Sequence, residues 1–180
     1  MKYVSFLFLL LLSLVFTGCL KEKSEETGTA GGSTTYFLRF KMNGTTKNLN
    51  FNNQAKFQVT PDVTTLVLTG FAAATPATNP ESLILSLNFL KAAPATGAYS
   101  EDGNPDDYVL GGIYLENTST SYYAGQEATP ALPLTLNLTK LDSAVAEGTF
   151  QGAFYKADAS GATTTENILI TEGSFRLPIK

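Results

Sequence analysis

The sequence predicts an all-β fold, an antiparallel β-sandwich or partly closed barrel of about ten short strands. After residue 34, apolar and polar side chains alternate with a period of two, the pattern of a half-buried strand. Turn-forming residues recur at intervals of roughly 8–12 residues, a spacing typical of sandwiches and barrels. No stretch after Cys19 has apolar residues at 3.6-residue spacing over three turns.

The first half of this region predicts a hairpin followed by three strands. Residues 36–42 alternate, Asn43-Gly44 forms a turn that tolerates positive φ, and residues 45–51 return. A break at Asn52-Asn53 precedes the next strand. The remaining strands of this half are expected over residues 55–60, 64–72 and 82–90, with a proline-containing loop over 73–80.

The middle is less regular and the end is the clearest part. Short strands are expected over 97–99 and 121–123, and a longer one over 108–117. In this longer strand, Gly111-Gly112 indicates a bulge or a close backbone approach. Strands over 134–141, 144–156 and 166–178 are joined by tight turns and predict a C-terminal three-strand meander. Gly173 interrupts the alternation of the last strand, which predicts a bulge there.

The first eighteen residues predict a signal peptide. Lys2 gives a positive start, residues 4–16 are apolar except for two serines, and Thr17-Gly18 precedes Cys19, the only cysteine. The apolar run is shorter than the roughly 20 residues of a membrane-spanning helix. Cys19 in this position resembles the bacterial lipobox, which implies acylation of Cys19 with fatty acids such as palmitate. The alternative is an ordinary signal peptide in which Cys19 is the last apolar residue.

Residues 19–33 are predicted to be the lipidated cysteine and a flexible tether, and residues 34–180 the β-sandwich domain. The Gly/Ser/Thr-rich half of the tether has few side chains that could pack. Glu22, Glu25 and Glu26 partly resemble an acidic surface-export signal, but Lys21 and Lys23 interrupt them, and a solvated linker explains them at least as well.

Composition limits the functions that this chain can have. Removing residues 1–18 takes away Lys2 and changes the net charge from −4 to −5, with the remaining cations scattered, which argues against nucleic acid as a partner. The sequence has no histidine and no tryptophan. Without histidine or a second cysteine, neither a Ser-His-Asp nor a Cys-His arrangement can form. A carboxylate pair of the glycosidase type is the one catalytic alternative, drawn from five glutamates: Glu116, Glu127, Glu147, Glu166 and Glu172.

Four short segments carry a family resemblance: Asn43-Gly44, Thr139-Lys140-Leu141-Asp142, Gly148-Thr149-Phe150 and the closing stretch from Ile168 to Phe175. Together they resemble a set of uncharacterised Bacteroidota lipoproteins that end in a Thr-Glu-Gly-x-Phe strand. The resemblance implies an all-β domain anchored in the outer membrane. It implies no assigned activity.

An acidic loop is the candidate metal site. It contains four carboxylates and an amide that could supply oxygen ligands to Ca²⁺: Glu101, Asp102, Asn104, Asp106 and Asp107. The spacing is not that of an EF-hand, and a turn rich in Asp, Asn, Gly and Pro explains these residues equally well. Apart from this candidate calcium ion, no cofactor is expected.

Two further features are candidates for a role at the cell surface. Tyr108, Tyr114, Tyr122 and Tyr123 could line a platform on which sugar rings stack, although β domains also place tyrosines at the edges of their cores. Ser143 lies in Asp142-Ser143-Ala144, which resembles the O-glycosylation motif of exported Bacteroidota proteins. A hairpin turn with an Asp cap is the alternative, and both can hold together.

These features together predict a membrane-anchored bacterial lipoprotein of the outer membrane, facing either the periplasm or the cell surface. Its β domain is expected to be a non-catalytic binding module with an envelope protein or glycan as ligand. One alternative is a structural or assembly accessory of the periplasm or outer membrane. The other is a carboxylate-based hydrolase. No sequence pattern indicates an oligomeric state.

Overall fold

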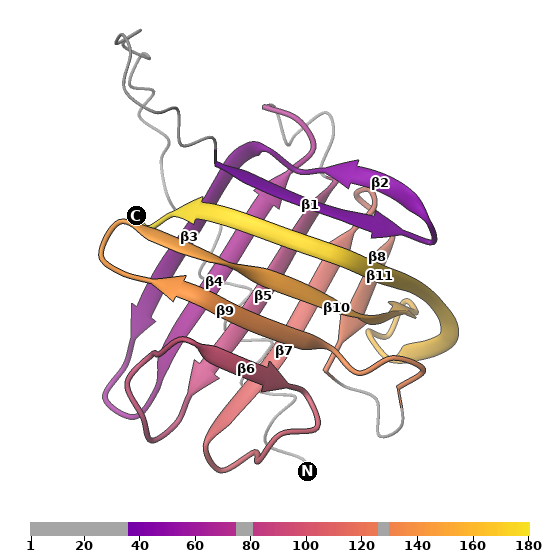
Figure 1. Cartoon of the computed structure of the whole chain (residues 1–180). Coiled ribbons are helices and arrows are strands. Elements are labelled where there is room, and N and C mark those ends of the chain that lie inside the picture. The colour runs from indigo at the N-terminus through magenta and orange to yellow at the C-terminus, as the bar shows by residue number, and fades with distance from the viewer. Residues whose placement is uncertain (1–35, 75–80, 126–129) are drawn as a thin grey trace, which may run out of the picture. The chain divides into compact units, whose positions relative to one another are not determined.

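The computed structural model describes residues 36–74, 81–125 and 130–180. Over these residues it is all-β, as predicted, with eleven strands and no helix (Figure 1). The strands are β1 (Phe37–Met42), β2 (Thr45–Asn48), β3 (Phe51–Val59), β4 (Thr64–Phe71), β5 (Ser82–Phe89), β6 (Gly97–Ser100), β7 (Tyr108–Leu115), β8 (Ser121–Ala124), β9 (Thr135–Leu141), β10 (Val145–Ala157) and β11 (Thr163–Pro178).

All eleven strands belong to one antiparallel sheet that curls into two layers. Its main path runs β2-β1-β11-β10-β8-β7-β5-β4-β3, while β9 pairs with β10 and β6 pairs with β9. The long strand β10 joins the layers, because residues 146–151 pair with β9 whereas Tyr155 and Lys156 pair with β8. We call β2, β1, β11, β10, β9 and β6 the front layer and the other five strands the back layer; their strands cross in Figure 1.

The last residues partly close the curled sheet. Ile179 forms a parallel bridge with Ala55 of β3, the strand at the far end of the main path. The Lys180 amide donates a hydrogen bond to the Ala55 carbonyl at 3.0 Å, and the Ile179 amide donates to the Ala144 carbonyl at 2.9 Å. The chain end therefore links the two layers where they would otherwise separate.

The core lies between the two layers and follows the alternation seen in the sequence. Leu38 and Phe40 of β1 are fully buried, and the Phe40 ring meets Tyr114 of the back layer edge-on, with centroids 6.1 Å apart. Phe150 of β10 also packs against the Phe40 ring, with centroids 6.0 Å apart. Burying a side chain of this size contributes about 1.5–3 kcal/mol. These contacts hold the front layer in a fixed position over the back layer.

The C-terminal meander and the bulge at Gly173 are both confirmed. Strands β9, β10 and β11 are consecutive antiparallel neighbours. Arg39 pairs with Ser174 and Lys41 with Thr171, so one extra residue of β11 is accommodated between these two pairs. Glu172, with φ of 51°, lies in this bulge.

One local prediction is corrected, and the structure selects between two alternatives for another. The break at Asn52-Asn53 is a bulge inside β3, because Asn52 adopts a positive φ of 45° and lets the strand continue. Gly111-Gly112 is not a bulge, since the register between β5 and β7 runs through it without a shift. It is a close approach, because a Cβ on Gly112 would lie 2.8 Å from the Phe154 ring.

Candidate functional site

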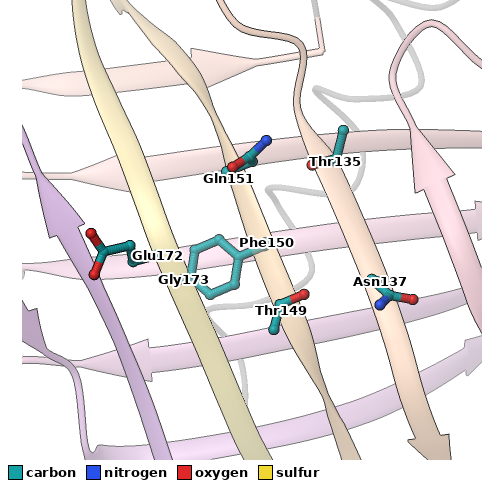
Figure 2. A pocket seen from close by; sticks show the side chains of 7 residues that line it. All are labelled: Thr135, Asn137, Thr149, Phe150, Gln151, Glu172 and Gly173. Carbon is teal, nitrogen blue, oxygen red and sulfur yellow. The ribbon is translucent and has the colours of Figure 1, made fainter.

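The candidate site is a shallow, open hollow of about 400 Å³ on the outer face of the front layer, over β9, β10 and β11 (Figure 2). We call it the β9–β11 hollow. Four uncharged polar residues line it: Thr135, Asn137, Thr149 and Gln151. The bulge residues Glu172 and Gly173 and the ring of Phe150 complete the lining. It was not predicted from the sequence.

Strand register places the four uncharged polar side chains in a grid. Thr149 of β10 pairs with Asn137 of β9, and Gln151 pairs with Thr135. Neighbouring strands lie about 4.8 Å apart, and residues two apart on one strand are separated by roughly 6.5–7 Å. Phe150, between Thr149 and Gln151, points into the core and is 3% exposed. The grid therefore rests on strands fixed by the core.

The bulge in β11 shapes the wall of the hollow. Gly173 pairs with Phe150, and a Cβ there would lie 2.4 Å from the Phe150 carbonyl oxygen and 2.8 Å from its ring. Only glycine fits this position. Its neighbour Glu172 adopts a left-handed conformation that costs about 1–2 kcal/mol for a side chain with a Cβ. Unlike Asn43 and Asn52, the other non-glycine residues with positive φ in the described chain, Glu172 is not a residue type that favours this conformation.

Two ion pairs lie beside the hollow. Lys41 Nζ donates to Glu172 Oε1 at 2.8 Å, and Glu172 extends toward β1 in Figure 2. Arg176 Nη1 donates to Glu147 Oε1. These two residues are paired across β10 and β11, two residues along each strand from the Thr149–Ser174 pair. Both ion pairs bridge neighbouring strands of the front layer. The grid itself carries hydroxyl and carboxamide groups only.

The acidic loop joins β6 to β7 and is organised by its own hydrogen bonds. Asn104 Nδ2 donates to Asp107 Oδ2 at 2.8 Å, and the Asp106 amide donates to Asn104 Oδ1 at 3.1 Å. Glu101 Oε1 instead accepts a hydrogen bond from the Leu134 amide at 2.8 Å. Among the described residues, no three His, Cys, Asp or Glu side chains are grouped as metal ligands. The turn interpretation accounts for these contacts, and calcium binding by Glu101, Asp102, Asn104, Asp106 and Asp107 stays a prediction.

The structure does not bring the four tyrosines together as a surface platform. Tyr114 is 0% exposed and Tyr122 is 6% exposed, and their rings lie 6.2 Å apart in the core. The platform prediction is therefore wrong for these two residues, because both side chains point into the core between the layers, where Tyr114 packs against Phe40. Tyr123 is half-buried on β8. Tyr108 is half-buried too, and its hydroxyl accepts a hydrogen bond from the Ser100 amide at 3.2 Å.

Tyr114 belongs to a polar cluster at the edge of the core. Its hydroxyl donates to Glu81 Oε1 at 2.6 Å, and Lys47 Nζ donates to the same oxygen at 2.8 Å. Burial raises the pKa of the Tyr114 hydroxyl, and the hydrogen bond with the Glu81 carboxylate raises it further. The Tyr114 hydroxyl therefore stays protonated to higher pH than an ordinary tyrosine, and it acts as the hydrogen-bond donor to Glu81.

Ser143 is exposed in the turn between β9 and β10. Asp142 Oδ1 accepts hydrogen bonds from the Ala144 amide at 2.8 Å and the Val145 amide at 2.9 Å. These backbone bonds lower the pKa of Asp142. The cap explains Asp142, while O-glycosylation of the neighbouring hydroxyl stays a prediction. Cys19, the signal peptide and the tether lie outside the described residues.

Three of the five glutamates considered for a hydrolase pair with cations, and Glu116 is exposed just after β7. Glu147 contacts Arg176, Glu172 contacts Lys41, and Glu166 accepts from Lys156 Nζ at 2.9 and 3.1 Å. Glu127 lies outside the described residues. Lys156 and Glu166 bridge β10 and β11, so this pair supports the meander and lies away from the hollow's lining.

No protein-family model, curated protein or solved structure matches this chain with significant similarity. Within residues 36–74, 81–125 and 130–180, no helix has the length and apolar character needed to cross a membrane.

Proposed function

We propose that this chain is a lipoprotein anchored in a bacterial outer membrane whose β domain is a non-catalytic binding module at the cell envelope. The observation that carries the binding role is the β9–β11 hollow. Its grid of Thr and amide side chains is mounted on strands that the core holds in place. Rigid elements present binding groups with little loss of conformational entropy on binding.

The anchor supports the location. Cys19 follows an apolar run of signal-peptide length and precedes a Gly/Ser/Thr-rich tether. Two acyl chains on a protein already suffice for stable membrane attachment. The resemblance to Bacteroidota lipoproteins supports the same location.

The chemistry of the hollow favours binding over hydrolysis. Its lining includes one carboxylate, Glu172, which is paired with Lys41, whereas a glycosidase needs two carboxyl groups facing each other across the substrate. The hollow's hydroxyl and carboxamide groups can donate and accept hydrogen bonds. The second candidate is a structural or assembly accessory. The pairing of all eleven strands in one sheet is also compatible with that role.

One titration separates these alternatives. Full-length protein extracted in mild detergent is titrated with purified envelope polysaccharide and with solubilised outer-membrane proteins, and the polysaccharide is analysed for shorter products. Saturable binding without products supports the proposal. Products that disappear in Glu172→Gln would identify a hydrolase, and the absence of saturable binding to either class would favour the structural role.

A further inference from the structure

We propose that the β9–β11 hollow binds a neutral sugar chain, recognised through its hydroxyl groups by the side chains of Thr135, Asn137, Thr149 and Gln151. This inference rests on the proposed binding function and names its ligand class and its site. It depends on the strand pairing around the hollow, the chemistry of the grid and the pairing of the nearby charges.

Strand pairing excludes one common mode of ligand recognition at this place. An extended peptide often binds by adding a strand to a free sheet edge. Residues 135–138 of β9 are paired with β6 on one side, and residues 135–141 are paired with β10 on the other. Strands β10 and β11 are also paired on both sides here. A ligand in the hollow therefore meets side chains and not unpaired backbone groups.

The grid suits a ligand that is rich in groups that both donate and accept hydrogen bonds. Threonine hydroxyls and the Asn137 and Gln151 carboxamides can each do both. Sugar hydroxyls have the same dual capacity, and they recur along a polysaccharide. The four side chains of the grid, two on β9 and two on β10, offer several such partners at once. A peptide with apolar side chains would need apolar pockets, and the ring in the lining, Phe150, is buried.

Charge pairing favours a neutral ligand over an anionic one. Lys41 is bound to Glu172, and Arg176 is bound to Glu147. Arg39 belongs to neither ion pair. Its guanidinium carbon lies 5.0 Å over the Phe37 ring and its Nε donates to Ser174 Oγ at 3.1 Å, so this cation lies across β1 and β11 and outside the lining of the hollow. The Lys41–Glu172 pair carries no net charge, so the lining offers a phosphate, sulfate or uronate group no net attraction. The Glu172 carboxylate can accept hydrogen bonds from neutral hydroxyls.

The test uses full-length protein in detergent and three neutral polysaccharides as probes: laminarin, mannan and dextran. Dextran sulfate is the anionic comparison. Binding is measured by affinity electrophoresis and by calorimetry. The variants Thr149→Val and Thr135→Val remove one hydroxyl each while keeping the branched shape that strands favour. Thr46→Val, on the exposed strand β2, is the matched control.

We expect saturable binding to at least one neutral probe. Each hollow variant should weaken it about 3- to 10-fold, as the loss of one hydrogen bond does, while Thr46→Val leaves it unchanged. Unfolding midpoints equal to that of the wild type would show that the variants fold. Neutral-sugar binding that the hollow variants do not alter would overturn the site but leave the proposed binding function standing. Binding to dextran sulfate alone, or to an envelope protein alone, would overturn the sugar assignment.

Discussion

Replacing Tyr114 with phenylalanine should destabilise the protein most at neutral pH and less at alkaline pH. The change removes the hydroxyl that donates to Glu81 Oε1 at 2.6 Å and leaves the Lys47–Glu81 ion pair in place. A hydrogen bond to a charged group contributes about 1.5–3 kcal/mol, so the free energy of unfolding should fall by roughly that amount at pH 7.

The pH dependence follows from the raised pKa of Tyr114. In the unfolded chain a tyrosine titrates near pH 10, whereas burial and Glu81 keep Tyr114 protonated to higher pH in the folded protein. Its stabilisation is therefore fully present below pH 10 and is lost as the pH rises toward the folded-state pKa. One proton difference changes the free energy of unfolding by about 1.4 kcal/mol per pH unit. The gap between wild type and Tyr114→Phe should thus narrow by about 1.4 kcal/mol between pH 9 and pH 11.

Urea unfolding at pH 7, 9, 10 and 11 measures this gap. The exposed Tyr36→Phe is the control for loss of a hydroxyl at the surface, and its effect at pH 7 should stay within about 0.5 kcal/mol. A gap for Tyr114→Phe that stays constant from pH 9 to pH 11 would refute the reasoning, since it would mean that Tyr114 ionises equally in the folded and unfolded states.

Two further predictions concern the fold. Gly112→Ala should lower the free energy of unfolding by about 1–3 kcal/mol and so lower Tm, because the new Cβ would lie 2.8 Å from the Phe154 ring and 3.0 Å from Leu85 Cδ2. An unchanged Tm would contradict the close approach. The lowered pKa of Asp142 gives stability that is present above its unfolded pKa of about 3.9 and lost as the pH falls below it. Asp142→Asn should therefore lose less stability than wild type between pH 5 and pH 2, and urea midpoints that fall equally in both would count against the cap.

The sequence revealed those features of the fold that depend on neighbouring residues. Alternation along 134–141, 144–156 and 166–178 predicted the meander, and its interruption at Gly173 predicted the bulge. Gly111-Gly112 indicated a close approach or a bulge, and the choice between them required the packing of Phe154, a residue more than forty positions away. At Asn52 a positive φ allowed a strand to continue through an expected break.

The candidate site depends on contacts between distant residues, which is why the sequence missed it. Thr149 and Asn137 become neighbours only through the register of β9 and β10, and the resemblance carried by Gly148-Thr149-Phe150 implies no activity for Thr149. Alternation did place both on the outward face of their strands, which is the one signal that could have indicated them. The tyrosines show the reverse problem. Tyr114 looks amphipathic in the sequence, but the pairing of β7 with β5 places it on the inward face, where its ring meets Phe40 in the core.

The most direct test of the proposed role at the envelope is the intact mass of the mature protein extracted from membranes. The account predicts a chain that begins at Cys19 and carries the added mass of fatty acyl chains, and Cys19→Ala should move the protein out of the membrane fraction. Any further mass on a peptide containing Ser143 would report O-glycosylation. A mature chain that begins at another residue and carries no lipid would contradict the anchor, and with it the placement of this binding module at the membrane surface.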